Sequence, residues 1–434
     1  MSLHKVHQQI EQTPLRPYQM LVIALGVLIN MLDGYDIIAL SIISPVLTRE
    51  WQLSPATLGV LFSATLTGMA VGAFLTPVAD VWGRRTAIIL NLCLMSMGML
   101  LSATATSVDM LWALRFCTGL GVGAMSGCVG TLVFEYCSIK ARNLGLGLVV
   151  IGYTIGNLLS GYAAPALLDE LSWRGVFVFG GALSVLLIPT IYFLLPESLD
   201  ILVARQSPHA LASINKILTR LKLEVFEMLP APVAKLKNAS LLDLFKQPLL
   251  QRTLLMAASY FLYMLTEYFF LNWNNQLTTN AGFTDVDGKF ITRLTSVGGI
   301  IGGIVIGVLS FKYPIRPVSI LTMIVMSLSL IAFGAAANNL LLAQVSAFVN
   351  GFCIFGVAVV LYAHGATTFP ARVRSTGMGL VMSAGRIGSI LGPATAGYML
   401  NADVSRFGVC LILSLPVLAS IATLVRVPLV DLED

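Results

Sequence analysis

Charged residues are scarce in this sequence. Asp, Glu, Lys and Arg make up 11% of its 434 residues, whereas a soluble domain normally contains about 25%. Hydrophobic residues supply 57%, and the mean hydropathy is +0.86. This balance excludes an ordinary soluble protein and indicates a chain that crosses a membrane several times. The net charge of +5 does not indicate a nucleic-acid partner, because the basic residues follow the membrane topology described below.

Histidine and cysteine, the usual residues of metal and redox sites, are also few and scattered. The sequence has four histidines, and its six cysteines lie mostly within apolar runs without metal-ligand spacing. It therefore predicts no metal and no cofactor, and it offers an enzyme neither a nucleophile nor a metal cluster. A membrane receptor would need an output domain, and the longest polar segment is only a central linker. The polar first seventeen residues predict no cleavable signal.

Apolar runs long enough to span a bilayer recur twelve times. They cover residues 18–43, 56–79, 86–106, 109–134, 144–168, 175–195, 252–276, 290–311, 316–337, 340–363, 375–399 and 406–427. The sequence thus predicts an all-α integral membrane protein with tails at 1–17 and 428–434. Two six-helix bundles, 18–195 and 252–427, flank a linker at 196–251. Within the linker we expect a short amphipathic surface helix over 211–228.

Lysine and arginine predict the orientation in the membrane. One side would hold Lys5, Arg16, Arg84, Arg85, Lys140, Arg142, the basic residues of the linker, Lys312, Arg316, Arg372, Arg374 and Arg426. The other side would hold only Arg49, Arg174, Lys289, Arg293 and Arg406. Because positive residues accumulate on the cytoplasmic side, the sequence predicts that both termini are cytoplasmic.

Glycine is dense in every third expected helix, namely 56–79, 144–168, 290–311 and 375–399. Small residues allow helices to approach closely, so we expect these glycines at the faces where the two halves meet. A three-helix period also predicts the inverted repeats found in many transporters. The alternative is that glycine is simply frequent in membrane helices.

The stretch Asp33-Gly34-Tyr35-Asp36 places two carboxylates in the first expected helix, which is otherwise uncharged. A charged side chain at membrane depth costs roughly 2.5–3.5 kcal/mol on insertion scales. Because residues three apart share a helix face, both must face protein or a wet cavity. Carboxyl groups in such places suit a proton carrier that works near neutral pH. We therefore expect Asp33 and Asp36 to couple transport to protons; a structural pairing with arginine is the alternative.

Three more charged residues lie well inside expected helices, away from their ends: Arg115, Glu267 and Arg386. Arg115 is a candidate either to organise the two aspartates or to bind substrate. Arg386 is a candidate to hold an anionic substrate, because a guanidinium can bind a carboxylate through two parallel hydrogen bonds; its alternative is to pair with Glu267. Glu267 is either a second proton site or that partner.

Aromatic side chains near these charges complete the candidate substrate site. Tyr35, Tyr263 and Trp273 could stack on a ring, and Asp36 lies next to Tyr35 in the sequence. Near the end of the expected helix 109–134, Glu135 and Arg142 are expected to form a salt bridge that acts as a gate.

Two motifs carry a resemblance to a known family. The loop after residue 79 reads Asp80-Val81-Trp82-Gly83-Arg84-Arg85, and the fourth expected helix contains Arg115-Phe-Cys-Thr-Gly119-Leu-Gly121-Val-Gly123. Both are similar to signatures of major facilitator superfamily transporters. Asp33-Gly34-Tyr35-Asp36 and the run from Arg386 to Pro393 more narrowly resemble the aromatic acid/proton symporters.

The sequence also departs from the family pattern. Thr76 and Val81 replace a usual glycine and a usual basic residue of the loop signature, and the corresponding loop at 307–316 lacks the acid. A proline usually follows the tryptophan of the seventh helix, where this chain reads Trp273-Asn274-Asn275-Gln276. These changes leave the predicted major facilitator fold in place and bear on the substrate.

The resemblance implies a secondary transporter of the inner membrane that imports a small, hydroxybenzoate-like carboxylate with protons by alternating access. Its partners would be the substrate, protons and the lipid bilayer, and it would work as a monomer. Asp80 would cap the expected helix 375–399 and latch the cytoplasmic side shut, while Gly83, Arg84 and Arg85 would anchor the loop.

Other functions remain open at this point. A non-aromatic organic acid as substrate is one alternative, and proton-coupled efflux is another. Efflux exchangers of the superfamily usually carry Gly-Pro in the fifth helix, where this chain has Gly156-Asn157. A receptor that binds without transporting is a more distant possibility.

Overall fold

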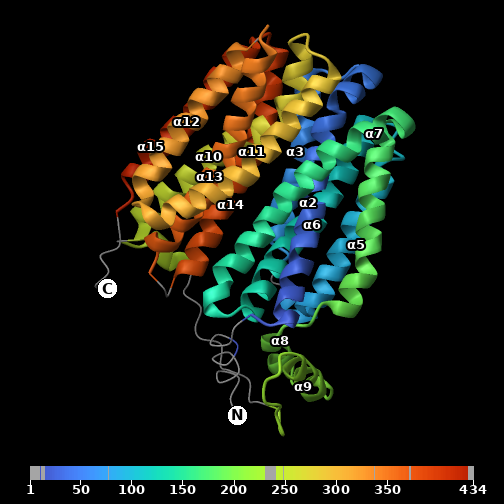
Figure 1. Ribbon diagram of the computed structural model, residues 1–434, viewed down its shortest axis with the longest axis vertical. Coiled ribbons are helices and arrows are strands. Elements are labelled where there is room, and N and C mark those ends of the chain that lie inside the picture. Colours follow the sequence, from blue (N-terminus) through green and yellow to red (C-terminus); the bar gives the residue numbers. More distant parts are fainter. Residues whose placement is uncertain are drawn as a thin grey trace. The chain divides into compact units, whose positions relative to one another are not determined.

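The computed structural model describes residues 10, 15–76, 78–229, 241–247, 249–336, 338–370 and 373–428. These described residues form helices and no strand. In chain order the helices are α2 (Pro17–Trp51), α3 (Pro55–Ala73), α4 (Val78–Trp82), α5 (Arg84–Ser102), α6 (Val108–Tyr136), α7 (Ile139–Leu194), α8 (Leu199–Arg205), α9 (Ala210–Arg220), a 3-10 helix (Leu241–Phe245), α10 (Leu249–Asn280), α11 (Asp285–Lys312), α12 (Ile315–Ala335), α13 (Leu340–Thr368), α14 (Arg374–Asn401) and α15 (Arg406–Val425). Figure 1 labels most of them.

The all-helical membrane fold predicted from the sequence is confirmed. Eleven stretches of the described residues are helices long and apolar enough to cross a membrane, two of them within α7. The remaining expected span corresponds to α14, which has 28 residues and is rich in glycine and serine. Each of the twelve expected apolar runs therefore corresponds to a helix.

Several helix ends differ from the expected ones. Helix α2 continues through Pro45 to Trp51 instead of ending near residue 43. Helix α3 ends at Ala73, and the separate short helix α4 follows, where one run to residue 79 was expected. Pro77 explains the early end, because proline disfavours helical geometry at the residue before it.

Helix α7 contains the fifth and sixth spans, Leu144–Leu168 and Glu170–Leu194. Its interior breaks at Ser172, whose φ of 60° and ψ of −176° are not helical. The break is held by Glu50 at the end of α2. One carboxylate oxygen of Glu50 accepts a hydrogen bond from the Trp173 indole at 2.8 Å, and the other accepts one from Arg174 at 3.3 Å.

Contacts divide the chain into two compact units. Unit 1 takes the described residues within 1–35, 68–156 and 177–237, and unit 2 takes those within 36–67, 157–176 and 238–434. Unit 2 thus includes the later part of α2, most of α3 and the break in α7, together with α10 to α15. We call the helix ends on the side of Trp51 and Pro55 the distal ends.

Glycines set the close helix contacts inside unit 1. At Gly68 and Gly72 of α3, an added Cβ would clash with the carbonyl oxygens of Phe116 and Leu120 in α6. Gly156 of α7 leaves no room for a Cβ, because the α2 backbone touches it. These helices pack backbone to backbone, as small residues permit.

Glycines also set the close helix contacts inside unit 2. Gly298 and Gly302 of α11 face carbonyl oxygens of α13, and Gly388 and Gly392 of α14 face those of α10. Most of the close contacts made by glycines of the four glycine-rich helices join two helices of the same sequence half. The expectation that the glycines mark the junction between halves is therefore wrong for them. It holds at Gly59 of α3, which meets α14 at Pro393, Ala394 and Gly397.

The linker contains the short helices α8 and α9. Helix α9 ends at Arg220, earlier than the expected residue 228, because Lys222 adopts a φ of 51° that a helix cannot contain. Beyond the turn, the Asn215 side chain exchanges two hydrogen bonds with the backbone of Phe226, both 2.8 Å long. The buried residues Ile214 and Leu218 form the apolar face of α9.

Candidate functional site

Arg115 of α6 is completely buried in unit 1. Its guanidinium donates hydrogen bonds to Ser102 Oγ at 2.9 and 3.1 Å and to Thr118 Oγ1 at 3.0 Å. The ring of Phe177 in α7 lies 4.5 Å from the guanidinium carbon. A buried cation must be satisfied in this way, and three helices thus hold Arg115 in a fixed orientation. Whether Arg115 organises the two aspartates or binds substrate stays a prediction.

Asp33 and Tyr35 of α2 also belong to unit 1, and both are buried. The Tyr35 ring lies 5.9 Å from the ring of Phe179 in α7. It fills the space beside Gly180, where an added Cβ would clash with Tyr35 and Met99. The ring therefore packs within the protein, and its contact with substrate stays a prediction.

Asp36 begins the part of α2 that belongs to unit 2 and is 1% exposed. Because α2 is helical across the whole motif, Asp33 and Asp36 lie on one face, one turn apart. The expected burial of both carboxyl groups is thus confirmed, while their role in proton coupling stays a prediction.

Unit 2 brings together three of the predicted residues. Glu267 of α10 is 6% exposed, and its carboxyl group lies within electrostatic range of the Tyr263 hydroxyl and the Arg386 guanidinium. Tyr263 donates to the carbonyl oxygen of Ile354 in α13 at 2.8 Å. Among the described residues, Glu267 Oε2 has no hydrogen-bond partner. A buried carboxylate oxygen without a donor is costly, which is typical of a site that a proton or ligand completes.

The glycines of α14 explain why these side chains meet. Gly385 and Gly388, on either side of Arg386, lie against Tyr260 and Phe261 of α10. The close approach of the two helices brings the guanidinium within range of the carboxyl group one turn beyond Tyr263. A partly exposed cation near a buried acid and a buried phenol can bind a carboxylate and a proton.

Trp273 lies farther along α10 and is fully buried. Its indole nitrogen donates to the carbonyl oxygen of Pro393 at 3.0 Å. Its ring meets that of Phe62 in α3 edge to face, with centroids 5.4 Å apart. The ring thus joins α10, α14 and α3, and its use as a stacking surface for substrate stays a prediction.

The polar residues around Trp273 have a role that sequence analysis missed. Asn275 Nδ2 donates to the carbonyl oxygens of Ser41 and Ile42 in α2, each at 3.0 Å. Thr292 of α11 donates to Asn274 Oδ1 at 2.7 Å. The sequence feature that could have indicated this role is the cluster of amides near the end of an apolar helix. From the sequence alone, this cluster was interpreted only as a departure from the family pattern.

A second network lies in unit 1, where α5 begins and α6 ends. Arg84 of α5 forms an ion pair with Glu135 of α6, with side chains 15% and 7% exposed. Sequence analysis expected Glu135 to pair with Arg142, whose side chain lies outside the described residues. That bridge stays a prediction, as does the latch at Asp80, whose side chain is also outside them.

Glu197 is the centre of this network, and sequence analysis gave it no role. Its Oε1 accepts hydrogen bonds from the backbone N–H groups of Arg85 at 3.1 Å and Ser198 at 2.9 Å. The first of these lies in the opening turn of α5, where a negative charge is favourable. Gly83 has a φ of 95°, and an added Cβ would clash with the Glu197 carboxylate. The predicted anchoring of the loop by Gly83, Arg84 and Arg85 thus has a physical basis in these contacts.

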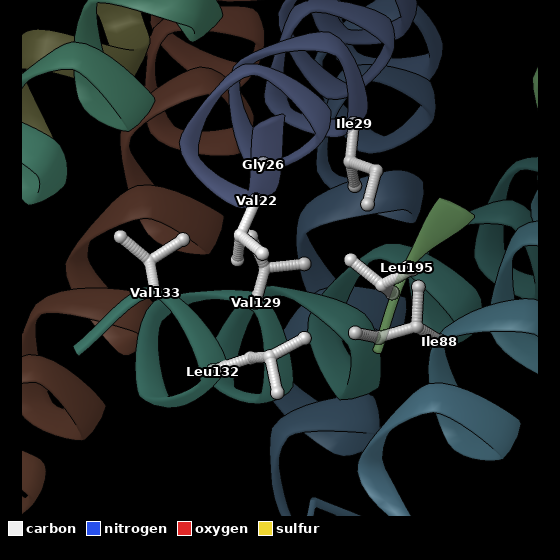
Figure 2. A pocket seen from close by; sticks show the side chains of 8 residues that line it. All are labelled: Val22, Gly26, Ile29, Ile88, Val129, Leu132, Val133 and Leu195. Carbon is white, nitrogen blue, oxygen red and sulfur yellow. The ribbon is translucent and has the colours of Figure 1, made fainter. Parts of the chain in front are cut away.

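A narrow apolar gap with essentially no room for a water molecule lies between α2, α5 and α6. Figure 2 shows the apolar side chains that line it, among them Val22, Ile29 and Leu132. It offers no partner for a carboxylate and is not the candidate site.

Comparisons with known proteins support a single family. The profile described as Major Facilitator Superfamily matches residues 25–284 and 256–432. The chain is 30% identical to a gallate transporter of Pseudomonas putida, with 96% of this chain and 93% of that protein covered. It is 29% identical to a benzoate transport protein of Acinetobacter baylyi (96% and 91% covered) and to the 4-hydroxybenzoate transporter PcaK of Pseudomonas aeruginosa (88% and 86% covered).

Solved structures share the fold. The inward open conformation of the xylose transporter XylE from E. coli has a TM-score of 0.74 at 16% identity, covering 96% of this chain and 98% of that one. An inward-facing bacterial homolog of the human lysosomal transporter Spinster has a TM-score of 0.67 at 15% identity, with 95% and 96% covered.

Proposed function

The chain belongs to the major facilitator superfamily and is a membrane transporter rather than an enzyme, and from this premise we propose that it imports a small aromatic carboxylate together with protons. The named cargoes of the similar proteins, gallate, 4-hydroxybenzoate and benzoate, are all aromatic carboxylates. We place the substrate in the hydroxybenzoate class on this support.

The observation that carries the proposal is the position of Arg386 beside Glu267 and Tyr263 in unit 2. The guanidinium would hold the substrate carboxylate through two hydrogen bonds. Tyr263, Trp273 and Tyr35 would supply aromatic surface for the ring, and Asp36 would contact the substrate from α2. Glu267 would serve as a second proton site or as the partner of Arg386 when no substrate is bound.

Asp33 and Asp36 would carry the coupled proton, with Arg115 as the residue that organises them. Import of one proton with a monoanion is electrically neutral, so that the pH gradient alone would drive it. A second proton would add roughly 2.3 kcal/mol per 100 mV of membrane potential, which corresponds to more than tenfold further accumulation. Three buried acids are compatible with either number.

Alternating access of the two six-helix bundles would move the substrate. We propose a bacterial inner membrane with both termini in the cytoplasm, which makes the distal ends the outer side. The Asp80 latch, the loop anchored by Gly83, Arg84 and Arg85, and a bridge from Glu135 to Arg142 would control the inner side. A monomer would suffice for this cycle.

Two other transport functions compete with this one. A non-aromatic organic acid would use Arg386 equally well and would not need the aromatic side chains. An efflux exchanger would be expected to carry Gly-Pro where this chain has Gly156-Asn157.

Uptake into proteoliposomes tests the proposal. The purified protein is reconstituted, a pH gradient is imposed, and a panel of radiolabelled acids is supplied, from 4-hydroxybenzoate and gallate to non-aromatic dicarboxylates. We expect gradient-dependent accumulation of aromatic acids alone. Accumulation of the non-aromatic acids only, or uptake that ignores the gradient for every compound, would overturn the proposal.

A further inference from the structure

Pro45 lies inside α2 and has no backbone N–H to donate. The carbonyl oxygen four residues earlier, that of Ser41, therefore lacks its helical donor. Two side chains replace it: Ser44 Oγ donates at 2.8 Å, and Asn275 Nδ2 of α10 donates at 3.0 Å. Asn275 Nδ2 also donates to the Ile42 carbonyl oxygen at 3.0 Å. Proline thus creates an acceptor within the membrane, and a residue from the other half of the chain uses it.

The contact is reciprocal and buried. Ser41 Oγ donates to the carbonyl oxygen of Asn272 in α10 at 2.8 Å. Ser41, Ser44 and Asn275 are 0% exposed and Asn272 is 3% exposed. Hydrogen bonds that are shielded from water hold their helices more firmly than exposed ones do. The distal parts of α2 and α10 are therefore joined by both side chains and backbones.

Three amide atoms at this junction have no hydrogen-bond partner among the described residues: Asn274 Nδ2, Asn275 Oδ1 and Gln276 Oε1. Asn275 Oδ1 lies directly against Gly288 of α11, where an added Cβ would clash with it. Buried polar atoms without partners destabilise the arrangement that buries them. The junction therefore combines strong attachments with groups that would gain hydrogen bonds on exposure to water.

Other contacts join the same distal ends. Ser63 Oγ of α3 donates to the Ile390 carbonyl oxygen of α14 at 2.7 Å. Arg49 at the end of α2 forms an ion pair with Asp285 at the start of α11. The Asn275 contact differs from these two contacts because its acceptor is a carbonyl oxygen that a proline has freed.

We propose that Asn275 is the latch of the distal gate, holding α2 to α10 at the carbonyl oxygen freed by Pro45, and that hydration of the unpaired amides favours its release. The inference rests on the proposed alternating access, in which the distal gate opens once per cycle. Opening exchanges the Asn275 hydrogen bonds for water contacts to Asn274, Asn275 and Gln276. Closed and open gates are then close in free energy, as a transporter requires.

This latch predicts opposite effects for substitutions at adjacent positions. Asn275→Ala removes the attachment and shifts the gate toward the open state. Gln276→Met keeps the side-chain length, removes one unpaired amide oxygen and shifts the gate toward the closed state. Pro45→Ala restores a backbone N–H at position 45 that can donate to the Ser41 carbonyl oxygen. This N–H competes with Asn275 for that oxygen, so the substitution opens the gate without changing α10.

Pulsed electron spin resonance measures the gate directly. Spin labels are placed at Leu171→Cys of α7 and Val286→Cys of α11, which are 58% and 72% exposed, in the full chain with Cys93 and Cys117 replaced by serine. The protein is held in lipid nanodiscs without substrate. We expect Asn275→Ala and Pro45→Ala each to raise the ratio of long to short distances roughly tenfold, and Gln276→Met to lower it.

The double variant of Pro45→Ala and Asn275→Ala should open the gate no further than Asn275→Ala alone, because Pro45→Ala acts only on the Asn275 hydrogen bond to Ser41, which Asn275→Ala already removes. The exposed Asn401→Ala is the matched control and should leave the distances unchanged. Unchanged distances in both Asn275→Ala and Pro45→Ala, or an additive double variant, would overturn the latch. If distances shift as expected while no aromatic acid is taken up, the latch stands and the proposed substrate falls.

Discussion

The buried Glu267 of α10 and the partly exposed Arg386 of α14 lie within electrostatic range of each other in unit 2, on two helices whose backbones glycines bring into contact. An acid beside the cation that would hold the substrate means that a carboxylate ligand and Glu267 compete for one guanidinium. Protonation of Glu267 would release Arg386 for the substrate. This relationship links the proposed binding of an anion to the proposed uptake of protons.

Arg386→Lys keeps the charge and loses the two parallel hydrogen bonds that a guanidinium offers. We expect the KM for an aromatic acid to rise about tenfold, with expression and melting temperature unchanged. Initial uptake rates over a range of substrate concentrations measure this. The exposed Arg426→Lys is the control. If Arg386→Lys leaves the KM unchanged, Arg386 does not bind the substrate.

Glu267→Gln preserves the shape of the side chain and removes its charge. We expect substrate to bind severalfold more tightly, because Arg386 loses its competitor, and gradient-driven accumulation to fall at least tenfold. Equilibrium binding across pH 5–8 should also become less dependent on pH. Scintillation proximity binding and uptake, measured on the same preparation, separate the two effects. Weaker binding by Glu267→Gln would contradict the competition.

The ion pair of Arg84 and Glu135 is mostly buried, so removal of one partner leaves an unpaired charge. We expect Arg84→Gln and Glu135→Gln each to lower the free energy of unfolding by on the order of 3 kcal/mol. The double variant should lose less than the sum, because neither charge then remains alone. Melting temperatures in detergent measure the cycle, and strict additivity would show that the pair is not coupled.

Two glycines of α14 form a matched pair for testing the helix contacts. A Cβ at Gly392 would clash with the Leu265 carbonyl oxygen of α10, whereas a Cβ at Gly379 would meet nothing within 4 Å. Gly392→Ala should therefore destabilise the protein by about 1–3 kcal/mol. Gly379→Ala should be neutral or stabilise it by up to about 1 kcal/mol, because alanine favours a helix. Equal melting temperatures for the two variants would argue against close packing of α10 and α14.

The sequence was sufficient for the membrane-spanning helices, because length and apolar composition are local properties. The break at Ser172 falls in the gap between the expected runs 144–168 and 175–195, but the sequence could not predict that Glu50 of a distant helix accepts hydrogen bonds from Trp173 and Arg174 there. Two further contacts could not be predicted for the same reason: Arg84 pairs with Glu135, and Glu197 caps a helix that begins far away in the sequence.

Some residues of the candidate site could be identified from the sequence, and others could not. Glu267 and Arg386 were candidates because charged residues are rare at membrane depth, and Tyr263 was one because its ring could stack on a substrate; the structure places the three within electrostatic range. Asn275 was given no role because an amide carries no charge. Its partner is a carbonyl oxygen, which becomes distinctive only through Pro45.

The central claim is that Asp33 and Asp36 move protons together with an aromatic carboxylate, and substrate-driven proton flux tests it most directly. Proteoliposomes without any imposed gradient are given 4-hydroxybenzoate, and the external pH is followed with a glass electrode in weakly buffered medium. We predict that the medium becomes more alkaline on addition of substrate, and that Asp33→Asn and Asp36→Asn abolish the change. Substrate entry without any alkalinisation, or an unchanged signal in both variants, would contradict the account.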